Sequence, residues 1–149
     1  MSTHSTEHGS FVLNRTYPAP PARVFAAWSS RDAKARWFGP ADGSMHLQLD
    51  FRVGGTEFLQ GGPPDGPVHT YEANYREIVP DERIVYDYTM DADGKVISVS
   101  VTTVEFAPAG DGTTLTFTEQ GVFLDGADTL TLREKGTSEL LDQLGDALG

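Results

Sequence analysis

The sequence predicts an α+β fold in which a curved antiparallel sheet covers one long C-terminal helix. The middle of the chain, from Met45 to Phe123, alternates apolar and polar residues with the period of two that is typical of strands. The C-terminal segment instead carries an apolar stripe at helical spacing. Because such a stripe must be buried, we expect the apolar face of the sheet to pack against it.

The composition fits one domain. The 149 residues are enough to bury a core and too few for two comfortable domains. We expect a flexible tail over residues 1–10 and a single domain over residues 11–149. The tail lacks the features of a secretory signal, and no apolar run is long enough to span a bilayer. A cytoplasmic protein without membrane insertion is therefore expected.

Charge and cysteine content exclude several classes of function. The net charge is −11, and no run of Lys or Arg forms a phosphate-binding stripe, so nucleic acid is an unsuitable partner. The chain has no cysteine, which rules out disulfides and thiolate chemistry. Its four histidines lack the spacing of metal ligands. We expect neither a metal nor a cofactor.

The first elements are a strand and two short helices. Phe11 to Tyr17 reads as a strand, and the proline-rich residues 18–21 end it and favour the first turn of a helix. A second short helix is predicted from Asp32 to Trp37, because Gly39-Pro40 prevents its continuation.

A meander of strands follows. Residues Met45 to Val53 place their odd-numbered, apolar side chains on one face, and a strand over Thr56 to Gln60 precedes a Gly/Pro-rich loop. Two further strands run from Thr70 to Arg76 and from Ile84 to Met90, and their tyrosines share one side. The sheet is therefore expected to have an aromatic inner face.

The next predicted strand, Val96 to Phe106, changes phase. Ile97, Val99 and Val101 favour one face, whereas Val104 and Phe106 favour the other, which a β-bulge or burial on both faces would explain. After a last strand over Thr113 to Phe123, the helical stripe consists of Leu130, Leu140, Leu141, Leu144 and Leu148. Gly136 is expected to loosen or split the first half of this helix.

Three motifs carry a resemblance to a known family: Arg36-Trp37-Phe38-Gly39-Pro40, the segment Leu49 to Gly55, and the segment Glu77 to Ile84. In order and spacing they resemble single-domain proteins akin to the C-terminal domain of the heat-shock-protein-90 ATPase activator. That family is a branch of the START-like, or SRPBCC, helix-grip superfamily. The resemblance extends from about Phe11 to Leu148 and implies a cavity between the sheet and the last helix.

One residue departs from the family pattern. Such proteins commonly carry Trp directly after the helix glycine, where this chain has Thr137. A smaller side chain there would enlarge or reshape the cavity. The chaperone activator itself also has a separate chaperone-binding domain, for which we expect no room in this chain.

Glu119 is the candidate catalytic residue. It continues the face of Leu115 and Phe117, where the pattern expects an apolar side chain. Burial would raise its pKa and suit it to general acid or base chemistry. The structural alternative is a strand-end carboxylate that reaches solvent or pairs with an arginine.

The predicted cavity is lined mainly by aromatic side chains from the strands and the second helix, although each of them can equally serve as ordinary core packing. The predicted lining residues are Trp37, Phe38, Phe51, Phe58, Tyr71, Tyr75, Tyr86, Tyr88, Phe117, Glu119, Thr137 and Leu140.

These residues favour a protein that binds a hydrophobic or aromatic small molecule. The first alternative is a cyclase, isomerase or hydrolase that uses Glu119 as acid or base. The second is a chaperone cofactor that acts through a protein surface. Exposed strand edges allow either a monomer or a homodimer.

Overall fold

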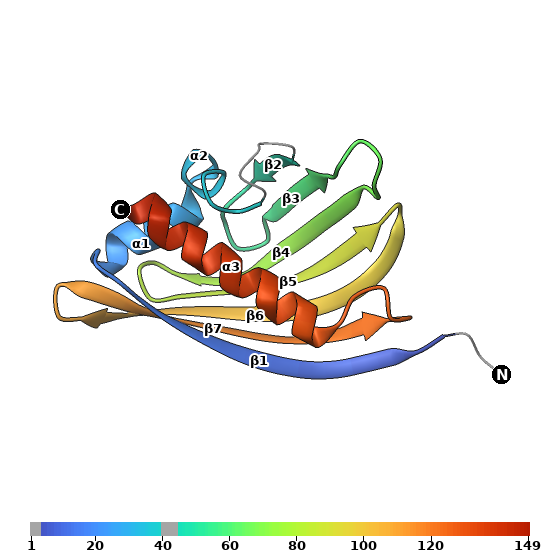
Figure 1. Ribbon diagram of the computed structural model, residues 1–149. Coiled ribbons are helices and arrows are strands. Elements are labelled where there is room, and N and C mark those ends of the chain that lie inside the picture. Colours follow the sequence, from blue (N-terminus) through green and yellow to red (C-terminus); the bar gives the residue numbers. More distant parts are fainter. Residues whose placement is uncertain (1–3, 40–44) are drawn as a thin grey trace.

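A single seven-stranded antiparallel sheet curves around the C-terminal helix in the computed structural model, which describes residues 4–39 and 45–149 (Figure 1). The strand order is β1-β7-β6-β5-β4-β3-β2. The predicted α+β helix-grip architecture is confirmed. The elements are β1 (Thr6–Tyr17), α1 (Pro21–Ser29), α2 (Arg31–Lys34), β2 (Met45–Leu49), β3 (Thr56–Gly61), β4 (His69–Val79), β5 (Arg83–Ala92), β6 (Lys95–Ala109), β7 (Gly112–Leu124) and α3 (Leu130–Leu148).

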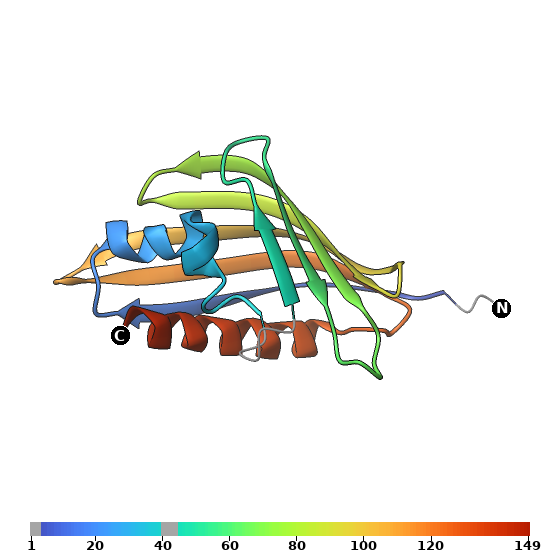
Figure 2. The ribbon, with the colours of Figure 1, turned by 90° about the horizontal axis from the view of Figure 1, so that it is seen from above.

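The helices lie on the concave side of the sheet. Seen from above, α3 runs alongside β1 and β7, while α1 and α2 cover the same side further along the sheet (Figure 2). The Tyr17 hydroxyl at the end of β1 donates a 2.7 Å hydrogen bond to the Leu141 carbonyl of α3. Leu141 and Leu144 are buried in the core between helix and sheet. None of the described helices is long and apolar enough to cross a membrane.

The first strand is longer than predicted. It begins at Thr6 instead of Phe11 and pairs with β7 from Thr6–Leu124 to Tyr17–Thr113. Residues 6–10 therefore belong to the sheet and not to a flexible tail. Backbone pairing with β7 holds them, and such pairing does not depend on apolar side chains. Residues 1–3 of the predicted tail lie outside the described residues.

The second helix is shorter than predicted. It covers Arg31–Lys34, whereas Asp32 to Trp37 was expected. The Ser30 side chain caps it, and the chain then continues in turns that let the Trp37 indole donate a 3.0 Å hydrogen bond to the Ala27 carbonyl. Pro40, predicted to end this helix together with Gly39, lies outside the described residues.

Strand β2 ends at Leu49, four residues earlier than the predicted end at Val53. The chain turns over residues 50–55, where the Arg52 guanidinium lies 3.0 Å from the Asp50 carboxylate. Gly54 adopts a positive φ of 83°, a conformation that glycine tolerates without strain. Val53 is consequently 58% exposed and does not belong to the apolar face.

Strand β6 contains a register shift near its start. Met90 of β5 pairs with Ser98, but its neighbour Asp91 pairs with Val96, so Ile97 is an extra residue in β6. This bulge does not explain the predicted phase change between Val101 and Val104, because the pairing is regular from Ser98 to Glu105. Over that stretch the even-numbered side chains, including Ser98, Ser100 and Thr102, are buried, while Val99 and Val101 are exposed on the outer face.

The last helix is not split at Gly136, because α3 is continuous from Leu130 to Leu148. Its N-terminus is well capped: the Thr129 side chain accepts from the Leu132 N–H, and the Glu7 carboxylate of β1 accepts from the Leu130 N–H at 2.9 Å. Capping and packing against the sheet outweigh the low helix propensity of one glycine.

Candidate functional site

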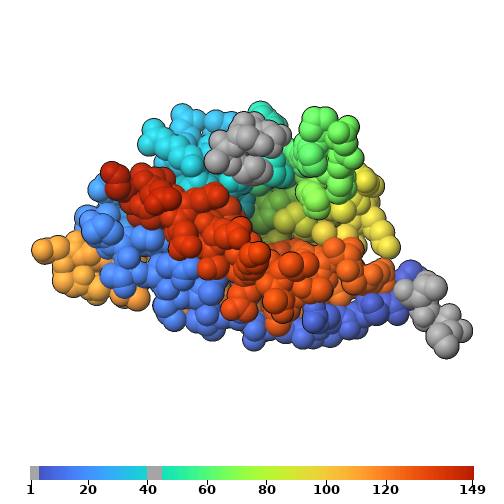
Figure 3. Space-filling view, in the orientation of Figure 1, coloured from blue at the N-terminus to red at the C-terminus, as the bar shows by residue number. Residues whose placement is uncertain are grey.

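A cavity of about 380 Å³ lies between α3 and the inner face of the sheet. A second hollow of about 680 Å³ shares Phe38, Tyr71, Met90 and Leu140 with it. The space-filling view shows the surface hollowed between α3 and the loop that joins β3 to β4 (Figure 3). Volumes of this size are typical of small-molecule sites.

Aromatic rings form most of the cavity wall. Tyr71 lies between two of them, with ring centroids 5.2 Å from Phe38 and 4.7 Å from Tyr88. On the helical side, the rings of Trp28 and Trp37 meet at 4.7 Å. Edge-to-face and tilted contacts of this kind are favourable, and they pack the rings into an apolar wall.

Most of the predicted lining residues surround this cavity. They are Trp37, Phe38, Tyr71, Tyr86, Tyr88, Phe117, Glu119, Thr137 and Leu140. Trp37 is also only 1% exposed and anchors its segment to α1, so the anchoring and lining roles coincide in this residue.

Three predicted residues lie elsewhere. Phe51 packs against Phe25 and Tyr75, with ring centroids 5.7 Å and 5.0 Å away. The Tyr75 hydroxyl donates a 2.6 Å hydrogen bond to Glu57. Phe58 lies on the face of β3 opposite to its buried neighbour Glu57. Strand alternation assigned Phe58 incorrectly because the inner face of β3 carries this charged residue.

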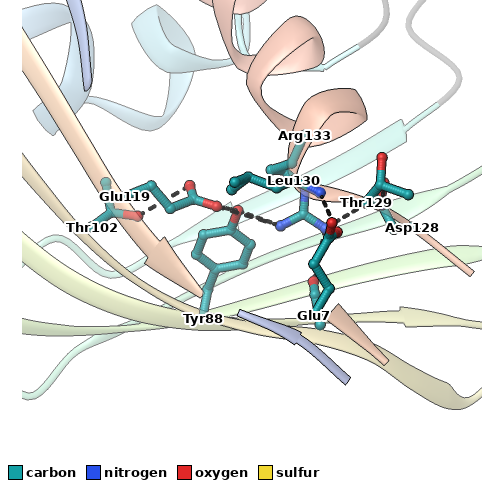
Figure 4. Close-up of polar contacts among 9 residues, drawn as sticks. Glu7, Tyr88, Thr102, Glu119, Asp128, Thr129, Leu130 and Arg133 are labelled. Atoms are coloured by element: carbon teal, nitrogen blue, oxygen red, sulfur yellow. Dashed lines mark hydrogen bonds and ion pairs between the residues drawn. The ribbon is translucent and has the colours of Figure 1, made fainter. Parts of the chain in front are cut away.

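A polar cluster closes one end of the cavity (Figure 4). The Tyr88 hydroxyl donates to the Glu119 carboxylate at 2.9 Å and accepts from the Arg133 Nη1 at 2.6 Å. The Nη2 of Arg133 donates to the Ser98 hydroxyl at 2.7 Å and to Asp128 at 2.8 Å. One arginine of α3 thereby connects two strands and the loop before the helix.

Glu119 is buried in the cavity wall and also pairs with an arginine. Its side chain is 2% exposed and lines the cavity, as the inward phase predicted, and its carboxylate lies 3.6 Å from the Arg133 guanidinium. Burial raises the pKa of Glu119, and the Arg133 charge and the Tyr88 hydrogen bond offset part of that rise. A carboxyl group in this environment can donate or accept a proton near neutral pH more readily than a surface glutamate.

Arg133 was not identified from the sequence, although a signal is present. It precedes Thr137 and Leu141 at intervals of four residues and therefore lies on the buried stripe of α3. Ser98, Ser100 and Thr102 likewise occupy the inward phase of β6. Polar residues in an apolar phase on two facing elements indicate a buried polar cluster.

A second buried ion pair lies behind the cavity wall. The Lys34 ammonium is 2.7 Å from the Glu57 carboxylate, and both side chains are 0% exposed. The ammonium also lies 4.4 Å from the centre of the Phe38 ring. Burial lowers the pKa of Lys34, and Glu57 opposes that change. Because neither charge lines the cavity, we assign this pair to the support of the wall.

Among the described residues, no group of three or more His, Asp or Glu side chains is arranged to hold a metal ion. The described side chains of the cavity wall provide aromatic rings, hydroxyl groups and the cluster around Arg133.

A sheet that grips a C-terminal helix around an aromatic cavity defines a ligand-binding fold of the helix-grip class. The family model described as "Activator of Hsp90 ATPase homolog 1-like protein" matches residues 18–149. The chain belongs to this family, which the motifs around Trp37, Gly54 and Pro80 indicated.

Solved structures agree with this assignment. An uncharacterized protein of Rhizobium leguminosarum is 44% identical, with a TM-score of 0.92 over 97% of each chain. A protein of Rhizobium loti is also 44% identical, with a TM-score of 0.90 over 96% of this chain and 99% of its own. A Chromobacterium violaceum protein is 28% identical, with a TM-score of 0.78 over 93% of this chain and 96% of its own. No curated protein matches the chain.

Proposed function

We propose that this protein binds a hydrophobic small molecule in the cavity between the sheet and α3. The observation that carries the proposal is the cavity of about 380 Å³, walled by aromatic side chains such as Trp28, Trp37 and Tyr71. An apolar molecule that leaves water for this space gains roughly 25 cal/mol for each Å² of apolar surface buried.

Thr137 is the position at which this proposal can be tested. It lines the cavity from α3 and is 7% exposed. A tryptophan at 137 would fill part of the cavity, and it is the residue that the family pattern has there.

The test is a titration with the neutral fluorophore N-phenyl-1-naphthylamine. We expect Thr137→Trp to weaken binding at least tenfold relative to the wild-type protein. Val101→Trp is the matched control, because Val101 is 39% exposed on the outer face of β6 and does not line the cavity. Equal affinity in the two variants would exclude this cavity as the binding site.

Glu119 supports a second candidate function, an acid- or base-catalysed reaction of the cyclase, isomerase or hydrolase type. The supporting observation is a buried carboxyl group that lines the cavity and has a raised pKa. For any substrate converted by the protein, Glu119→Gln should abolish turnover and preserve binding of the fluorophore. Full turnover by that variant would exclude this mechanism.

A further inference from the structure

Two buried hydrogen-bond donors on the cavity wall have no partner among the described residues: the Tyr71 hydroxyl and the Trp28 indole N–H. A buried polar group without a partner is costly, and buried groups in folded proteins are normally paired. Tyr71 also lines the neighbouring hollow, so it lies where the two spaces meet. A ligand that supplies an acceptor to these donors would remove the cost.

Several other polar groups of the wall are already paired. Tyr88 donates to Glu119 and accepts from Arg133, and Arg133 also donates to Ser98 and Asp128. The Gln143 amide donates to the Trp37 carbonyl at 2.7 Å. Among the described residues, Tyr71 and Trp28 are the wall residues with a fully buried donor that lacks a partner.

The available groups define the chemistry of that ligand. An indole N–H can only donate, so its partner must be an acceptor. Burial and the nearby Glu57 carboxylate hold the pKa of Tyr71 well above its usual value, so the hydroxyl keeps its proton as a donor.

The charge of the wall argues against an anionic ligand. Glu119, Asp128 and Glu139 line the cavity beside a single arginine, and that arginine is already paired. A carboxylate would enter an apolar space with net negative charge and without a free cation, which is unfavourable.

We infer that the cavity selects neutral aromatic or alicyclic molecules that carry an oxygen acceptor, such as a ketone, and that the Tyr71 hydroxyl donates to this oxygen. This inference rests on the proposed function and deepens it. The Trp28 N–H provides a second donor on the helical side of the same cavity.

Three probes of nearly the same size test the inference: tetralin, 1-tetralone and tetralin-1-carboxylate. Their affinities are measured by displacement of N-phenyl-1-naphthylamine at pH 7.5. We expect 1-tetralone to bind about five- to tenfold more tightly than tetralin, the range that one added hydrogen bond provides. The carboxylate should bind more weakly than either neutral probe.

The decisive variant is Tyr71→Phe, with Tyr75→Phe as its matched control. Tyr71→Phe removes only an unpaired hydroxyl, so its unfolding midpoint should not fall, but its preference for the ketone should disappear. Tyr75→Phe should lower the unfolding midpoint, because the Tyr75 hydroxyl is bonded to Glu57, yet keep the ketone preference of the wild-type protein.

Two results would overturn the inference while the cavity proposal stands: equal binding of ketone and hydrocarbon by the wild-type protein, or a ketone preference that survives in Tyr71→Phe. Tighter binding of the carboxylate would also overturn it, in favour of an anion-selective site. If none of the probes or the fluorophore binds, the proposed function fails first, and the inference fails with it.

Discussion

Arg133 of α3 donates a 2.6 Å hydrogen bond from its Nη1 to the phenol oxygen of Tyr88 on β5. This bond crosses from the helix to the inner face of the sheet at one end of the cavity (Figure 4). Because Tyr88 in turn donates to Glu119, the position of a buried acid depends on an arginine in another element. The polar end of the cavity is therefore a single connected unit.

Arg133→Met should lower the free energy of unfolding by about 3–5 kcal/mol, because it leaves the Glu119 and Asp128 carboxylates without their cation. Urea unfolding measures this change. In a Glu119→Gln background the same substitution should cost less, with a coupling of about 1–3 kcal/mol. If the two substitutions changed the free energy of unfolding additively, Arg133 and Glu119 would not belong to one connected unit.

The buried pair of Lys34 and Glu57 should respond in the same way. Lys34→Met leaves a fully buried carboxylate unpaired and should cost about 3–5 kcal/mol in the free energy of unfolding. Adding Glu57→Gln should recover much of the loss, since an amide needs no cation. The control is Arg52→Met, whose ion pair with Asp50 is exposed and whose removal should not measurably change stability. A similar loss in both methionine variants would contradict this explanation.

Glu119 should make stability depend on pH in a defined direction. Burial raises its folded-state pKa above the ordinary value of 4.5, so the folded protein retains this proton to higher pH than the unfolded chain does. Its contribution to stability therefore falls as pH rises from 4.5 through the raised pKa and is constant above it. Relative to Glu119→Gln, the wild-type protein should lose stability across that window in urea unfolding at successive pH values. Parallel pH profiles for the two proteins would refute the raised pKa.

Two glycines of α3 offer a matched comparison. A Cβ at Gly136 meets nothing within 4 Å, so Gly136→Ala should raise the free energy of unfolding by about 0.5–1 kcal/mol through helix propensity. A Cβ at Gly145 lies 3.3 Å from the Tyr17 ring, so Gly145→Ala should gain less or lose stability. Thermal unfolding of both variants checks this order, and an equal gain would show that the Tyr17 contact does not matter.

The sequence predicted the architecture well because alternation along strands and spacing along a helix are local signals. The irregular apolar pattern around Val101 is different: Ser100 and Thr102 lie on the inner face of β6, whereas Val101 is exposed on the outer face. Boundaries were less predictable. The extension of β1 to Thr6 depends on pairing with Leu124, more than one hundred residues away, which the apolar pattern does not reveal.

The aromatic cavity residues and Glu119 could be predicted from the sequence, but the buried cations in and behind the cavity wall could not. Tyr71, Tyr86 and Tyr88 follow strand alternation, and the structure places all three on the cavity wall. Lys34 and Arg133 were missed because a charged side chain in a helix normally lies in solvent. Their burial depends on partners that the fold brings together, such as Glu57 for Lys34.

Native mass spectrometry of the gently purified protein tests ligand binding in the cavity most directly. The wild-type protein and Val101→Trp should each carry one noncovalent adduct per chain, and Thr137→Trp should have lost it. The retained compound, released by denaturation, should be neutral and largely apolar. Equal adduct occupancy in Thr137→Trp and the wild-type protein, or no adduct on the wild-type protein even with saturating N-phenyl-1-naphthylamine, would contradict the account.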